Sequence, residues 1–286
     1  MLYSAIAAAV LIAVVMVSLY PRKKAPSGVS SLNTSLEFSP QDSDRFTLLC
    51  TLSQNGSSSP YAYFLLGFNG PLGQISVTRL FSETVLTEDG AGNKVILGES
   101  FDKNGAKGAA GELNRCLGLE VSRYISFTNS SLIEFAELFD PVTLNVPQDL
   151  SQVDRKKDIF IKIDKGRQQL GGALFADYIA CTAWKFGASQ TLKESAEAVT
   201  AFLRQNHEAL SLALDERAEE FILSKTKTNI SVTDVERRRE LVKFLLFESG
   251  DGVITLAVDG EYKNANTEFH LSEQSRKSLR SRYGSI

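Results

Sequence analysis

The chain has 286 residues, 43% of them hydrophobic, which is enough to bury a sizeable core. Its 31 basic and 34 acidic residues give a formal net charge of −3. Nucleic-acid-binding domains usually carry an excess of basic residues, so this balance argues against a nucleic-acid partner. The three cysteines, Cys50, Cys116 and Cys181, are an odd number without a C-x-x-C motif, so we expect buried free thiols rather than a disulfide framework or a zinc site.

Residues 2–20 form an uncharged, apolar segment. As a helix with a rise of ~1.5 Å per residue it would span roughly 28 Å, about one bilayer core. No small-residue cleavage pattern follows it, so we expect residues 1–20 to be an uncleaved, single-pass transmembrane anchor. Residues 21–44 are rich in Ser and Pro and are expected to be a flexible linker. The basic cluster at 22–24 favours a cytosolic body by the positive-inside tendency.

Short β-rich runs and helical stretches alternate along residues 45–286, which predicts one domain with a layered α/β fold, a mixed sheet flanked by helices. The spacing of Thr233 and Glu236 predicts a capping box at the start of the last long helix. The basic, serine-rich C-terminal residues are expected to be a frayed tail. The predicted strands cover 46–52, 61–68, 74–81, 121–127, 142–146, 158–163 and 252–258, and the predicted helices cover 105–117, 130–139, 170–183, 191–203 and 234–247.

Two segments resemble a known family. The run from Leu113 to Asp149, LNRCLGLEVSRYISFTNSSLIEFAELFDPVTLNVPQD, is similar to the central segment of the LytR-CpsA-Psr family of membrane-anchored cell-envelope proteins. The run from Gly166 to Tyr178, GRQQLGGALFADY, is similar to that family's G-x-Q-x-L-x-G-x-x-A-x-x-Y segment. The resemblance covers about residues 45–265 and implies an extracytoplasmic globular domain on the cell membrane, the opposite of what the basic cluster favours.

Members of this family are understood to bind a polyprenyl phosphate or pyrophosphate lipid that carries a glycopolymer, and to transfer the polymer to peptidoglycan. The resemblance therefore implies a long apolar pocket for the lipid tail. It also implies arginines that grip the phosphates and acidic residues that hold a divalent cation such as Mg²⁺. Clustered guanidinium groups and oxygen ligands suit these two tasks.

The family's charged motifs are largely replaced in this sequence. Its I-P-R-D-T motif falls on residues 80–84, which puts Ser82 in place of the arginine and Glu83 in place of the aspartate. Arg79 lies three residues earlier, and an odd offset in a strand turns a side chain to the opposite face unless a bulge or turn re-aims it. The family's Y-x-R-x-R run begins at Tyr178, so Ala180 and Thr182 stand where its two arginines would be.

The loss of several charges together predicts a non-catalytic role in cell-wall assembly, either lipid-binding or scaffolding. The predicted partners are the membrane, through residues 2–20, a polyprenyl lipid and cell-wall assembly proteins. We predict no catalytic or metal-binding residue and no cofactor. The candidate ligand-binding residues are Arg79, Glu83, Arg167, Tyr178 and Lys185.

Two alternatives remain open at this point. In the first, displaced residues such as Arg79 and Glu83 keep an active transferase that attaches polyprenyl-pyrophosphate-linked glycopolymers to peptidoglycan and uses Mg²⁺. In the second, the domain only docks a protein partner, and its own aromatic side chains fill the pocket: Tyr61, Tyr63, Phe64, Phe101 and Phe175.

Overall fold

The computed structural model describes residues 38–286 except 89–93, 155–158, 214–216, 248–251 and 285–286. The predicted transmembrane anchor and most of the predicted linker lie outside these residues. Phe38–Ile286 forms one compact unit, in which Phe38 already packs against Phe244 with the ring centres 5.7 Å apart. Across the described ranges, no helix is both long enough and apolar enough to cross a membrane.

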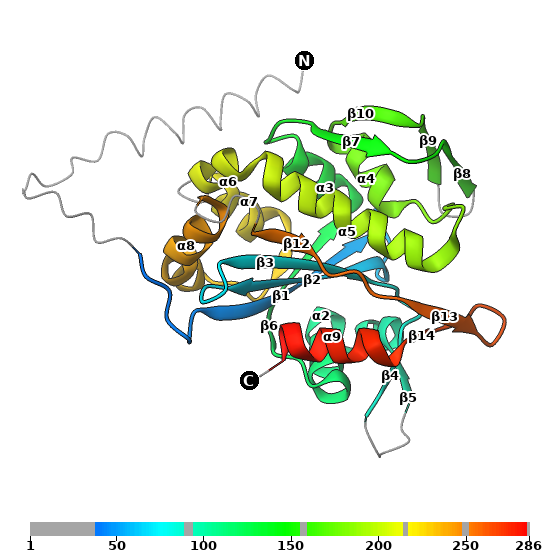
Figure 1. Cartoon of the computed structure of the whole chain (residues 1–286), viewed down its shortest axis with the longest axis horizontal. Coiled ribbons are helices and arrows are strands. Elements are labelled where there is room, and N and C mark those ends of the chain that lie inside the picture. Colours follow the sequence, from blue (N-terminus) through cyan, green and yellow to red (C-terminus); the bar gives the residue numbers. More distant parts are fainter. Residues whose placement is uncertain (1–37, 89–93, 155–158, 214–216, 248–251, 285–286) are drawn as a thin grey trace, which may run out of the picture. The chain divides into compact units, whose positions relative to one another are not determined.

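A six-stranded mixed sheet lies at the centre of the unit, in the order β11-β6-β1-β2-β3-β12 (Figure 1). The three central strands form an antiparallel meander, and β6 and β12 run parallel to β1 and β3. This confirms the predicted mixed sheet. The bounds are β1 Arg45–Ser53, β2 Pro60–Asn69, β3 Gln74–Leu80, β6 Val121–Thr128, β11 Lys227–Thr228 and β12 Val253–Thr255.

Helices cover one face of this sheet and pack a layer of aromatic rings against it (Figure 1). The alternation of β3 points Ile75 and Val77 toward this layer. Phe135 lies at its centre, with ring centres 5.3–6.3 Å from those of its four aromatic neighbours. The helices are α3 Asn129–Ala136, α4 Gly172–Ala180, α5 Gly187–Gln205, α6 His207–Ala213, α7 Arg217–Lys225 and α8 Val232–Phe247.

Two helices, α2 (Leu97–Leu117) and α9 (Glu273–Tyr283), pack on the opposite face of the sheet (Figure 1). Helix α2 contains a break at Gly105, where φ is 62°, so the helix predicted to start there is the second part of a longer element. Gly118 ends it in the left-handed region with φ 64°, directly after residue 117, where the predicted helix ends.

Four two-stranded ribbons complete the described unit: β4 Val85–Thr87 with β5 Lys94–Ile96, β7 Val142–Val146 with β10 Gly166–Leu170, β8 Leu150–Asp154 with β9 Ile159–Ile163, and β13 Gly260–Lys263 with β14 Glu268–Leu271. The prediction of one helix over 170–183 and one strand over 252–258 was too long in both cases. Leu170 ends a strand that pairs with Val142, and α4 begins only at Gly172.

Two local predictions were wrong. The capping box of α8 is formed by Ser231 and Asp234, not by Thr233 and Glu236. The Ser231 hydroxyl accepts from the Asp234 amide at 3.2 Å, and the Asp234 carboxylate accepts from the Ser231 amide at 3.0 Å. The C-terminal segment is not frayed but forms α9. The cysteine prediction is confirmed for Cys116 and Cys181, which are free and buried, whereas Cys50 is free and half-buried.

Candidate anion site around Arg79

Arg79 is a buried cation in the central strand β3. It lies opposite Phe64 of β2 and shares the face of Ile75 and Val77, so its side chain points toward α5. Only 1% of its surface is exposed. One guanidinium nitrogen, Nη1, donates to the carbonyl of Thr191 at 3.3 Å and to the Ser195 hydroxyl.

No carboxylate neutralises this guanidinium within the described ranges, where none lies within 4.0 Å of it. Burial lowers the pKa of Arg79 to about 10, and the nearby Tyr61, Tyr262, Cys181 and Glu83 oppose this shift. The guanidinium carbon also lies 5.6 Å from the centre of the Phe81 ring. A buried charge without a counter-ion costs folding free energy, and a bound anion would offset that cost.

Tyr61 supplies a second polar group because of a bulge at the edge of the strand pair. Leu52 pairs with Ala62, but Ser53 pairs with Pro60, so Tyr61 is the extra residue. A bulge changes the direction of a side chain. Tyr61 packs against the core on the face of the sheet that carries Arg79 and faces α5. Burial raises the pKa of the Tyr61 hydroxyl, whereas the charge of Arg79 lowers it.

Two polar atoms of this site have no hydrogen-bond partner in the described part of the chain. They are Nε of Arg79 and the hydroxyl of Tyr61, and both atoms are buried. Buried donors normally have a hydrogen-bond partner, so two buried donors without one at the same location are unusual. A single anionic ligand with two or more oxygens could accept from both.

The wall of the site comes from the junction of α4 and α5. The Ser195 hydroxyl that meets Arg79 also donates to the Ile179 carbonyl at 3.2 Å, which ties α5 to α4. Burial raises the pKa of the Asp177 carboxyl and of the Cys181 thiol, and the charge of Arg79 acts against the shift at Cys181. The arginine-bearing positions implied by the family resemblance, Ala180 and Thr182, flank this cysteine.

The structure brings some of the predicted residues together. Glu83 lies in the turn after β3, where its Oε2 accepts from the Ser82 hydroxyl at 2.8 Å, and its charge acts on the pKa of Arg79. Tyr178 is a wall residue, and its hydroxyl donates to Glu194 at 3.2 Å. Arg79 itself lies in a regular part of β3, so no bulge re-aims it; the bulge lies at Tyr61 of the neighbouring strand.

The other two predicted residues lie elsewhere. Arg167 is exposed on β10, opposite Asn145 of β7, in a ribbon separate from the central sheet. Lys185 is exposed, and its ammonium nitrogen lies 5.7 Å from the centre of the Phe186 ring. Neither has a described contact with Arg79.

Sequence reasoning missed three residues of the site, Asp177, Ser195 and Tyr262, and it named Tyr61 only as an aromatic side chain that fills the pocket. An arginine within the apolar strand pattern was the one usable signal, since a buried arginine requires polar groups around it. The bulge and the docking of α5 determine where the other residues of the site lie, and both depend on tertiary packing.

The Mg²⁺ site that the transferase alternative requires is not assembled by the residues that the structure describes. In these ranges no group of three or more His, Cys, Asp or Glu side chains could hold a metal ion. Glu83 is engaged by the Ser82 hydroxyl and belongs to no such group. A hard cation needs several oxygen ligands, so this acidic residue does not fit the role alone.

No protein-family model and no curated protein sequence matches this chain. Solved structures do. A protein of Eubacterium siraeum provisionally described as a transcription regulator matches with TM-score 0.76 and 22% identity, over 91% of this chain and 98% of that one. TagV of B. subtilis matches with TM-score 0.63 and 16% identity, over 83% of this chain and 96% of that one.

TagT bound to LI-WTA also matches, with TM-score 0.62 and 14% identity, over 85% of this chain and 92% of that one. TagT and TagV are LytR-CpsA-Psr proteins. At these identities the likeness concerns the fold, and it confirms the expectation from the sequence motifs: the chain has the LytR-CpsA-Psr fold.

Proposed function

We propose that the chain is a cell-envelope protein that binds a phosphate-linked glycopolymer lipid without transferring the polymer. The fold supports a role in cell-wall glycopolymer assembly, because related structures include TagT bound to LI-WTA. In this proposal residues 2–20 anchor the chain in the membrane and the described unit is extracytoplasmic, as the family resemblance implies.

The observation that carries the proposal is the buried, unneutralised Arg79. A phosphate group could accept from Nε of Arg79 and from the Tyr61 hydroxyl, which satisfies two donors that are otherwise unpaired. Charge-assisted bonds between guanidinium and phosphate are strong in such a dry site. Arg79 is thus the group expected to hold the ligand.

The same site supports binding better than transfer. Transfer of a phosphate-linked group requires stabilisation of charge that develops on phosphate oxygens, usually by several cations together. Here Ser82, Ala180 and Thr182 occupy the positions where the resemblance implies arginines. One guanidinium can hold a phosphate, but it supplies little of the differential stabilisation that catalysis needs.

A scaffolding role has its own support in the interior packing. Rings fill the layer between the sheet and α3–α5, where Phe175 stacks on Phe202 with centres 5.2 Å apart. Phe64 is buried in this layer, whereas Tyr63 and Phe101 pack on the opposite face of the sheet, with centres 6.1 Å apart. The aromatic filling expected for a docking domain is therefore present in part, and lipid entry would require these rings to move.

The test compares Arg79→Met with Arg167→Met in the full-length chain in neutral detergent. Binding of a polyprenyl phosphate is measured by native mass spectrometry, and phosphate release from a polyprenyl-pyrophosphate glycopolymer is measured with Mg²⁺ present. We expect the unchanged chain and Arg167→Met to bind lipid without turnover, and Arg79→Met to bind at least about tenfold more weakly.

Three results would be decisive. Turnover by the unchanged chain that is lost in Arg79→Met would establish the transferase alternative and overturn the binding proposal. Absence of lipid binding by the unchanged chain would leave the docking role in its place. Equal binding by the two variants would exclude Arg79 as the phosphate-holding group.

A further inference from the structure

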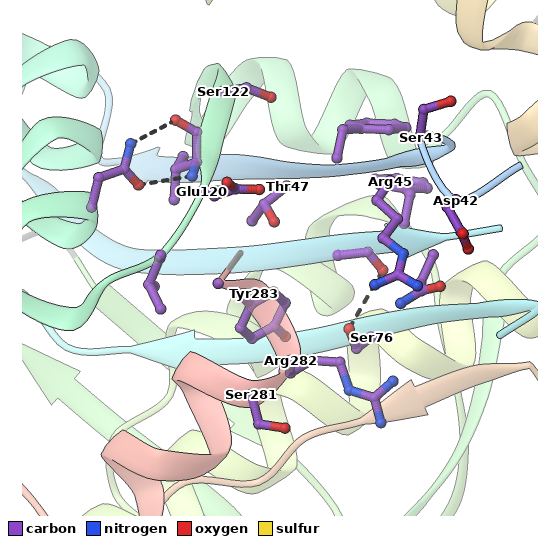
Figure 2. Close-up of a pocket in the computed structure, with 18 of the residues that line it drawn as sticks. Asp42, Ser43, Arg45, Thr47, Ser76, Glu120, Ser122, Ser281, Arg282 and Tyr283 are labelled. Atoms are coloured by element: carbon purple, nitrogen blue, oxygen red, sulfur yellow. Dashed lines mark hydrogen bonds between the residues drawn. The ribbon is translucent and has the colours of Figure 1, made fainter. Parts of the chain in front are cut away.

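A groove of about 960 Å³ lies at the other end of the sheet from Arg79 (Figure 2). It forms where β1 begins and β2 ends: Arg45 pairs with Asn69, which pairs with Gln74 at the start of β3, five positions before Arg79. We call it the Arg45 groove. Its floor is the face of the sheet that α9 covers, with the polar side chains of Thr47 and Ser76.

Three arginines from separate elements line the Arg45 groove: Arg45 of β1, Arg238 of α8 and Arg282 of α9. Figure 2 shows Arg45 and Arg282 reaching toward the same side of the groove. The nitrogen Nη1 of Arg282 donates to Gln74 at 2.9 Å, and the guanidinium carbon of Arg238 lies 4.2 Å from the centre of the Phe46 ring. Both guanidinium groups are therefore held in place by neutral groups.

None of these three arginines forms an ion pair within the described ranges, although carboxylates are near. The neighbouring Arg123 shows the contrast, because it is paired with Asp234 at 2.5 Å. The nitrogen Nε of Arg45 is buried and has no hydrogen-bond partner among the described residues. Three positioned cations and one unpaired buried donor at one groove are the features of an anion site.

The remaining lining narrows the class of ligand. Two carboxylates, Asp42 and Glu120, also line the groove, so the three arginines leave a formal excess of one positive charge. A long polyanion would meet strong repulsion at these two carboxylates, whereas a single phosphate group carries less charge and meets less repulsion. The hydroxyl side chains around it, including those of Ser122 and Ser281, can bond to ligand hydroxyl groups.

We propose that the Arg45 groove binds a phosphate ester flanked by hydroxyl groups, with Arg45 and Arg282 holding the phosphate. Glycerol phosphate has this chemistry, either as a soluble ester or as the headgroup of a glycerophospholipid. The site is separate from the lipid site proposed at Arg79, because its floor is the other face of the sheet and its lining shares no residue with that site.

The experiment is isothermal titration of the full-length chain in neutral detergent with three probes: glycerol 3-phosphate, inorganic phosphate, and short-chain phosphatidylglycerol below its micelle concentration. We expect glycerol 3-phosphate to bind more tightly than inorganic phosphate, and its binding to weaken as salt is raised. If the short-chain lipid binds at least as tightly as glycerol 3-phosphate, the phosphate ester that the groove binds is a lipid headgroup. Binding of the soluble ester alone would identify a soluble ligand.

Arg45→Gln and Arg282→Gln are each expected to weaken glycerol 3-phosphate binding at least about tenfold. The matched control is Arg237→Gln, an exposed arginine on α8 outside the groove, which should bind like the unchanged chain. Arg79→Met should also bind normally, which separates this site from the proposed function. Far-ultraviolet circular dichroism checks that each variant folds. No binding of any probe, or equal binding by Arg45→Gln and Arg282→Gln, would overturn the proposal.

Discussion

The hydroxyl oxygen of Tyr283 lies 2.8 Å from Oγ1 of Thr78, which joins the last helix of the chain to the middle of the central sheet. The Thr78 hydroxyl donates to the Leu256 carbonyl at 2.9 Å, so it accepts from Tyr283. Both side chains are buried. Burial also raises the pKa of Tyr283 to about 12, which keeps this hydroxyl protonated as a donor.

Tyr283→Phe removes this donor while keeping the ring. Because a buried hydrogen bond contributes about 1 kcal/mol net, we expect the free energy of unfolding to fall by about that amount. Urea denaturation followed by circular dichroism measures the change. Tyr124→Phe is the control, since the Tyr124 hydroxyl makes no hydrogen bond among the described residues. Equal stability of the two variants would show that the contact with Thr78 contributes nothing.

Gly67→Ala should be destabilising because the sheet and α9 approach closely at this point. An added Cβ would lie 2.7 Å from Cε1 of Tyr283 and 2.9 Å from Oγ of Ser76. Overpacking of this kind typically costs about 1–3 kcal/mol. Gly111→Ala is the matched control: no atom lies within 4 Å of its added Cβ, and it should stabilise α2 by about 0.5–1 kcal/mol. Thermal denaturation should therefore move the two melting temperatures in opposite directions.

The main sheet could be predicted from the sequence, because β1, β2 and β3 each show a β-rich run bounded by turn residues. The C-terminal helix could not, although its pattern is present. Ser275, Leu279 and Tyr283 are buried at a spacing of four, which places them on one face of α9. Serines and arginines surround these three residues. The polar composition of the whole segment therefore indicated a frayed tail, although one face of the helix is buried.

The candidate site was predicted in part, with Arg79 at its centre and Glu83 and Tyr178 beside it. Arg79 follows from its alternation with Ile75 and Val77, which places it on a buried face. The unpaired Tyr61 depends on a one-residue bulge, and no local pattern fixes the register at which β1 and β2 meet. Ser195 depends on how α5 docks against the sheet, which is a property of the whole core.

Glu268 predicts a pH dependence of stability. Hydrogen bonds from Lys94, Asn264 and His270 lower the pKa of this carboxyl to about 2 from its ordinary 4.5, the bond from Lys94 having the largest effect. A lowered folded-state pKa contributes stability above the unfolded value, and this contribution is lost as the pH falls from 4.5 toward 2.

Glu268→Gln should therefore lower the melting temperature at neutral pH, and the difference from the unchanged chain should narrow as the pH falls through that window. Glu240→Gln, an exposed position on α8, serves as the control and should change little. A constant difference across the whole pH range would mean that the ion pair with Lys94 is not its origin.

Arg79→Met should weaken ligand binding without lowering the free energy of unfolding. Methionine fills much of the same volume, removes the buried charge, and eliminates the unpaired Nε. The Ser195 hydroxyl keeps its bond to the Ile179 carbonyl, whereas the Ser195 hydroxyl oxygen and the Thr191 carbonyl each lose a donor from the side chain. Replacing a buried charge by an apolar group of similar size is often neutral or stabilising, by up to about 4 kcal/mol. We therefore expect the free energy of unfolding to stay level or rise in urea denaturation. A clear fall instead would mean that Arg79 is retained for the stability of the fold, and the reason to assign it a ligand would be gone.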